Sequence, residues 1–85
     1  MEFVASPEFF EVYEGLDNPT AECVDDAIRR VLAEPASAWA RQNRVVGEHG
    51  SSWLIALRCG GTDFSLYWRQ PEPAEPIELL LLLRR

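Results

Sequence analysis

The sequence contains no lysine, a single histidine and only two cysteines, Cys23 and Cys59. The sequence lacks a glycine-rich phosphate-binding loop and a metal-binding pattern. It also has no Ser, His and Asp residues whose spacing alone would identify a catalytic triad. Two cysteines without a second pair do not make a structural zinc site, so we interpret them as reduced thiols. His49 stands beside a glycine and is interpreted as a loop residue. The sequence therefore predicts neither a cofactor nor a metal ion.

Long apolar runs are missing as well. The N-terminal residues MEFVASPEFF have neither the basic region nor the apolar run of a signal peptide. The longest leucine run, Leu79 to Leu83, is far shorter than the roughly 20 residues that cross a bilayer. We therefore expect a soluble, cytoplasmic protein without a membrane partner.

The residues that are abundant indicate one packed domain. Hydrophobic residues make up 47% of the 85 residues and include nine aromatic ones, which is typical of a globular chain. A chain of this length forms one core, so we predict a single domain, residues 1–85. The net charge is −6, and residues 1–34 carry nine acids against two arginines. Such a protein repels polyanions on average.

Two helices are predicted in the first half of the chain. Ser6 can cap free amides, and Pro7 fits a first helical position that needs no amide donor. Apolar residues then recur at helical spacing over residues 7–16. Asp17-Asn18-Pro19 repeats this start, and a second apolar stripe covers residues 19–34. The adjacent acids Asp25 and Asp26 diverge on this helix and are interpreted as a solvated face.

The rest of the chain predicts strands. Residues 1–5 form a short first strand, and residues 53–59 and 64–69 form a hairpin around two adjacent glycines. A last strand, residues 77–83, follows a connection with three prolines, and its leucine run indicates a central strand or one covered by a partner. Part of residues 35–52 is a further candidate strand. The predicted order is β-α-α-β-β-β, an α+β domain with two N-terminal helices packed on a small antiparallel sheet.

Strand alternation places a candidate site on the sheet face away from the helices. Arg58 and Tyr67 fall on this face, and with the terminal Arg84-Arg85 they would suit an anion. The alternative is that these arginines pair with neighbouring acids. Leu54 and Ala56 make the same face partly apolar, which suits a protein contact.

The tryptophans of the hairpin, Trp53 and Trp68, are interpreted as core residues rather than as platforms for nucleic-acid bases.

Several stretches of the sequence together resemble one protein family. They are the opening F-V-x-S-P-E-F-F-E, the helical hairpin closed by A-E-P, and the run W-L-I-A-L-R-C-G-G-T-D-F-S-L-Y-W. In this order they resemble the RelE/ParE superfamily of bacterial toxins, which includes HigB-like members. The resemblance covers nearly the whole chain. It implies a toxin that binds a cognate antitoxin and either cleaves messenger RNA on the ribosome or, in ParE members, poisons gyrase.

The resemblance also implies site residues. Arg58 matches the arginine that ends the family's aromatic-rich strand, Tyr67 matches the tyrosine of the following strand, and Arg85 lies near the basic residue after the last strand. Leu54 and Ala56 stand where RelE-type ribonucleases carry lysines. Without those cations, a phosphate-cleaving site loses charge stabilisation of its transition state.

Two functions are consistent with these observations. The first is a toxin of a type II toxin–antitoxin module that acts as a ribosome-dependent endoribonuclease, with Arg58, Tyr67 and Arg85 as catalytic residues. The second is a non-catalytic protein-binding domain on the same scaffold, either a degenerate toxin or a ParE-like inhibitor of a protein target. In that case Leu54, Ala56 and Leu81 contact the partner, which is a helix, a strand or a second copy in a homodimer.

Overall fold

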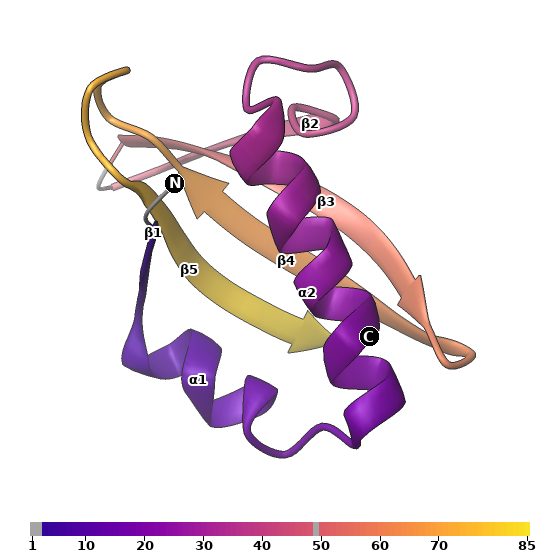
Figure 1. Ribbon diagram of the computed structural model, residues 1–85. Coiled ribbons are helices and arrows are strands. Elements are labelled where there is room, and N and C mark those ends of the chain that lie inside the picture. Colours follow the sequence, from indigo (N-terminus) through magenta and orange to yellow (C-terminus); the bar gives the residue numbers. More distant parts are fainter. Residues whose placement is uncertain (1–2, 49) are drawn as a thin grey trace.

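The computed structural model describes residues 3–48 and 50–85 (Figure 1). Its elements are β1 (Phe3–Ala5), α1 (Pro7–Tyr13), α2 (Asn18–Ala33), β2 (Asn43–Gly47), β3 (Gly50–Cys59), β4 (Thr62–Arg69) and β5 (Ile77–Arg84). The predicted α+β class is confirmed. The start of the first strand at residues 1–2 and the loop prediction for His49 lie outside the described residues.

The sheet has five strands in the order β1-β5-β4-β3-β2. The predicted order had four strands, and the additional one is β2, which falls in the candidate stretch 35–52. The prediction of an all-antiparallel sheet is wrong at one edge, because β1 runs parallel to β5. The two helices carry the chain from β1 to the far edge of the sheet. Three antiparallel pairings then bring it back beside β1.

Both helices begin at the predicted caps. The Ser6 side chain accepts a hydrogen bond from the amide of Phe9, and the Asp17 side chain accepts one from the amide of Thr20. Each helix has a proline in its first turn, where an amide donor is not needed. The hydrogen bond from Thr20 lowers the pKa of the Asp17 carboxyl, because it favours the ionised form.

A β-bulge joins the first helix to the sheet. In the β4–β5 ladder Tyr67 pairs with Leu81 and Trp68 pairs with Leu79, so Leu80 has no partner in the register. The hydroxyl of Ser6 donates to the carbonyl of Leu80, and the amide of Ser6 donates to the carbonyl of Leu79 at 2.9 Å. Ser6 therefore caps α1 and also satisfies a carbonyl beside the bulge.

The core lies between the helices and one face of the sheet. It contains buried side chains from α1, α2 and the three long strands, among them Phe9, Val24, Val31, Ile55 and Leu66. Trp68 is fully buried, as predicted for a core residue, and its Nε1 donates to the carbonyl of Ala40 at 2.8 Å. A tryptophan with no exposed surface cannot stack on a base. Trp53 is half-buried and packs against this core.

The hairpin between β3 and β4 is confirmed and is longer than predicted. Gly60 and Gly61 form its two-residue loop, and both have positive φ angles of 61° and 80°. Two positive φ values are what a type I′ turn requires, and glycine adopts them without a steric penalty.

The prediction of two reduced thiols is wrong. Cys23 of α2 and Cys59 of β3 form a disulfide, with a Cα–Cα distance of 5.7 Å. Cys59 has the strand parity of Ile55 and Leu57, so its side chain faces the helices, and Cys23 lies on the side of α2 that faces the sheet. The bond therefore crosses the interface between helix and sheet.

Candidate functional site: the open face of the sheet

One face of the sheet is not covered by any element of residues 3–48 and 50–85. Figure 1 shows α1 and α2 on the same side of the sheet, and α1 packs on β5 while α2 packs on β3. Side chains of alternate strand residues point to the opposite side. We call this side the open face. In the three long strands it is formed by Leu54, Ala56, Arg58, Asp63, Ser65, Tyr67, Arg69, Glu78, Leu81 and Leu83.

The middle of the open face is mostly apolar, and its one serine, Ser65, is buried. Leu54, Tyr67 and Leu81 stand side by side on β3, β4 and β5, because Tyr67 pairs with both leucines in the register. The next row holds Ala56, Ser65 and Leu83. Leu83 is 42% exposed and Ala56 is also exposed, whereas the Leu54, Tyr67 and Leu81 side chains are half-buried. We call these two rows the apolar band.

Charged residues border the apolar band at both ends. At one end, the Arg69 guanidinium binds the Glu78 carboxylate, with Nε–Oε2 at 2.8 Å. This ion pair raises the pKa of Arg69. At the other end, Arg58 pairs with Asp63 in the register, and the backbone amide of Arg85 donates to the Asp63 carbonyl at 2.8 Å. In the described part of the chain, the Arg58 side chain forms no ion pair or hydrogen bond.

The three predicted catalytic residues do not form one cluster. Arg58 and Arg85 both lie beside Asp63, at the same end of the open face. Tyr67 shares this face but lies four residues further along β4 than Asp63, a distance of about 13 Å along the strand. Arg84, which was predicted to join them, instead lies over the Phe64 ring at 5.6 Å, on the helix side.

The predicted partner-binding residues do lie together. Leu54 and Leu81 flank Tyr67 in one row of the apolar band, and Ala56 belongs to the adjacent row. The last strand, β5, is an inner strand of the sheet, as its leucine run predicted. Only its helix side is covered, however, because Leu79 and Leu82 are buried while Leu83 is exposed on the open face.

One pocket of the described residues lies away from the open face. It has a volume of about 580 Å³ and lies between the loop after α2 and the proline-rich loop before β5. Pro35, Pro73, Pro76 and Ile77 line it together with Arg41 and Glu75. It shares no residue with the open face.

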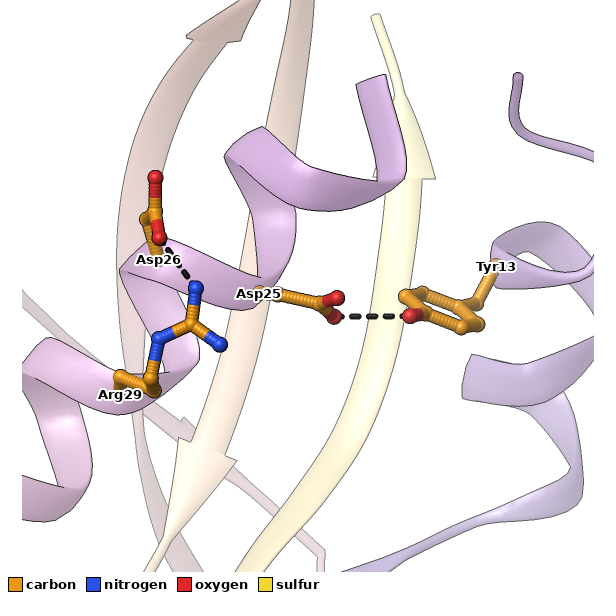
Figure 2. Close-up of polar contacts among 4 residues, drawn as sticks. All are labelled: Tyr13, Asp25, Asp26 and Arg29. Atoms are coloured by element: carbon orange, nitrogen blue, oxygen red, sulfur yellow. Dashed lines mark hydrogen bonds and ion pairs between the residues drawn. The ribbon is translucent and has the colours of Figure 1, made fainter. Parts of the chain in front are cut away.

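A polar contact between the helices was missed by the sequence analysis. The Tyr13 hydroxyl of α1 donates to Asp25 Oδ1 of α2 at 2.7 Å, and Figure 2 shows the two side chains pointing toward each other. This hydrogen bond, followed by partial burial and the carboxylate charge, raises the pKa of Tyr13. Asp25 is therefore not simply solvated, whereas Asp26 is exposed and pairs with Arg29 on the outer side of α2.

Among the described residues, no group of three or more His, Cys, Asp or Glu side chains is placed so that it could hold a metal ion. Neither described helix is long and apolar enough to cross a membrane. No protein-family model, no curated protein and no solved structure matches the chain.

Proposed function

We propose that this chain is a non-catalytic protein-binding domain whose open face receives a helix of a partner protein. The observation that carries the proposal is the apolar band, which spans β3, β4 and β5 and is not covered by any element that the structure describes. Exposed apolar surface rimmed by polar residues is typical of protein interaction sites. The predicted contact residues Leu54, Ala56 and Leu81 all belong to this band.

The size of the apolar band fits a helix. Neighbouring strands lie about 4.8 Å apart, so three strands span about 10 Å, and the two rows are about 7 Å apart. A helix with its side chains is about 10 Å wide and rises 5.4 Å per turn. The band therefore accommodates the apolar stripe of about two helical turns.

The charges at the ends of the band specify the partner further. Arg69 is neutralised by Glu78, whereas Arg58 and Arg85 stand beside the single acid Asp63. An acidic residue at one end of the partner helix would pair with Arg58. Charge complementarity of this kind fixes the orientation of a bound helix.

The test uses one substitution within the band. Ala56 is exposed, so Ala56→Glu adds a charge to the apolar band without removing a buried group. Burying that charge under a helix has a high cost, and we expect binding at least about tenfold weaker. The matched control is Glu11→Arg, an exposed site on α1.

The measurement is affinity capture from the cell that encodes the chain, followed by calorimetry with the purified partner. Support requires a partner that binds the wild type and Glu11→Arg equally well and loses affinity for Ala56→Glu. A captured protein that does not distinguish Ala56→Glu from the wild type would overturn the proposal, as would the absence of any retained partner.

The toxin function is a second proposal, supported by the resemblance and by the arginine pair Arg58 and Arg85 beside Asp63. Two guanidinium groups at one end of a sheet can hold a phosphate. The distance of Tyr67 from this pair speaks against a three-residue catalytic site. The disulfide also speaks against a cytoplasmic ribonuclease, because disulfides are rare in reducing compartments.

Expression of the wild type and of Arg58→Ala in a bacterium without an antitoxin tests this second proposal. Growth arrest with messenger RNA cleavage that Arg58→Ala abolishes would establish it. Unchanged growth and intact messenger RNA would refute it and leave the binding domain. Arrest without cleavage would refute the ribonuclease and direct attention to gyrase or another protein target.

A further inference from the structure

The pocket between the loop after α2 and the proline-rich loop before β5 has no part in the proposed function. Its volume of about 580 Å³ lies in the range of about 300–1,000 Å³ that is typical of small-molecule sites. Pro35, Pro73, Pro76 and the buried Ile77 give it an apolar lining. Ligand sites of this size are mostly apolar and contain a few placed polar groups.

The wall formed by the loop after α2 is fixed by hydrogen bonds. The Arg41 amide donates to the Ser37 carbonyl at 3.1 Å, and the Ala40 amide donates to the Ser37 hydroxyl oxygen at 3.1 Å. The Ala40 carbonyl in turn accepts from Nε1 of the buried Trp68. This wall is therefore anchored to the core of the domain.

The proline-rich loop before β5 forms the opposite wall and is braced as well. Nε2 of Gln70 donates to the carbonyls of Pro73 and Glu75, at 3.3 and 3.0 Å. Three prolines restrict the backbone of this loop further, because the ring fixes φ. A ligand that enters a pocket with two braced walls has little ordering of the protein to offset.

Arg41 supplies a cation in a defined orientation. Its Nε donates to the Pro35 carbonyl at 2.9 Å, and its guanidinium lies over the Trp53 ring, 5.2 Å from the centroid. In the part of the chain that the structure describes, the two Nη atoms of Arg41 form no hydrogen bond or ion pair. The planar fork of an arginine matches the two oxygens of a carboxylate.

Glu75 restricts the charge of the ligand. It lines the same pocket as Arg41, but among the described residues the two side chains form no ion pair. The charged lining is thus one arginine and one acid, with no net formal charge. A ligand with one negative charge can bind Arg41, whereas a second negative charge, as on a phosphate monoester, adds repulsion from Glu75.

We propose that this pocket binds a small monocarboxylic acid with an apolar body. The carboxylate accepts hydrogen bonds from the Nη atoms of Arg41, and the body packs against the proline rings and Ile77. The pocket shares no residue with the open face, so the ligand does not compete with the partner helix. The proposal is therefore independent of the proposed function.

Matched pairs of probes test the proposal on the oxidised full-length chain. Hydrocinnamate and isocaproate each join one carboxylate to an apolar body, and their primary amides keep nearly the same shape without the charge. Heteronuclear NMR titration measures binding, with the backbone amides of Ala36, Ala74 and Ile77 as reporters in the pocket. We expect at least one acid to bind with a Kd of about 1 mM or tighter, and its amide to bind about tenfold more weakly.

Three variants locate the site. Arg41→Gln removes the charge and should abolish the preference for the acid over its amide. The matched control is Arg44→Gln, because Arg44 is another exposed arginine that hydrogen-bonds the chain, through Ser51, but does not line the pocket. This variant should keep the preference. Ala74→Trp places a large side chain at an exposed position of the lining and should abolish binding of acid and amide alike.

The NMR spectrum of each variant also shows whether it is folded. The proposal is wrong if neither acid shifts the pocket amides at concentrations up to about ten times the expected Kd. An amide that binds as tightly as its acid would contradict the role of the carboxylate. A folded Arg41→Gln that keeps the preference, or a folded Ala74→Trp that binds like the wild type, would place the site elsewhere. No partner protein is present in these titrations, so their outcome does not depend on the open face.

Discussion

At the scale of single residues, Tyr13 is the group whose environment most clearly affects pH behaviour. Its hydroxyl donates to Asp25, and its pKa is raised above the ordinary value of about 10. The raised pKa in the folded state means that the contact stabilises the protein fully below about pH 10. This contribution is lost as the pH rises through the folded-state pKa, because an ionised Tyr13 repels the Asp25 carboxylate.

We therefore predict that Tyr13→Phe lowers the free energy of unfolding at neutral pH by about 1 kcal/mol, the ordinary net value of a partly exposed hydrogen bond. The difference from the wild type should shrink above about pH 10. Urea unfolding at several pH values measures it. A difference that stays constant to the alkaline end would show that the lost contact is not the hydrogen bond to Asp25.

Residue patterns in the sequence predicted which face of a strand or helix a side chain occupies better than they predicted which residue it contacts. The strand alternation correctly placed Leu54, Ala56 and Tyr67 on one face. It also carried a signal for the disulfide, because Cys59 has the parity of the buried Ile55. Pairing it with Cys23 required the position of α2 over β3, which is a tertiary property. The Tyr13–Asp25 contact also depends on tertiary structure, because it requires the positions of the two helices relative to each other.

At the scale of elements, the joint between α1 and the sheet depends on Ser6. Its side chain accepts from the Phe9 amide at 3.2 Å and donates to the Leu80 carbonyl. We predict that Ser6→Ala lowers the free energy of unfolding by about 1–2 kcal/mol, because the helix loses its cap and a carbonyl beside the bulge loses its donor.

The matched control is Ser6→Thr, which keeps a hydroxyl that can cap the helix. Chemical unfolding measures the stability, and amide hydrogen exchange at Phe9 locates the loss. Faster exchange at Phe9 in Ser6→Ala, with Ser6→Thr close to the wild type, is the expected result. Equal stability of the alanine and threonine variants would show that the hydroxyl does not hold this joint.

The helix starts were predictable because caps and prolines are local signals, and the hairpin was predictable because two glycines mark its turn. β2 gave a weaker signal. In its sequence NRVVG, only Val45 is even half-buried, so the strand lacks the alternation that identifies a covered strand. The parallel pairing of β1 was not predictable either, since it depends on where the whole chain returns.

At the scale of the whole molecule, the disulfide has the largest expected effect on stability. It joins residues 36 positions apart and connects the helix layer to the sheet. A chain of 85 residues buries a small core, so a covalent link contributes a large share of its stability. This link would be missing in a reducing compartment. The cytoplasmic location stays a prediction, and the disulfide favours an oxidising environment.

We predict that reduction lowers the free energy of unfolding by about 3–4 kcal/mol, the chain-entropy value for a loop of this length. That is a large part of the about 5–15 kcal/mol that stabilises a typical domain. Urea unfolding followed by tryptophan fluorescence, with and without reductant, measures the change. Cys23→Ala/Cys59→Ala should match the reduced wild type, and reductant should not affect it. A wild type that unfolds at the same urea concentration with and without reductant would show that packing of α2 alone holds the two layers together.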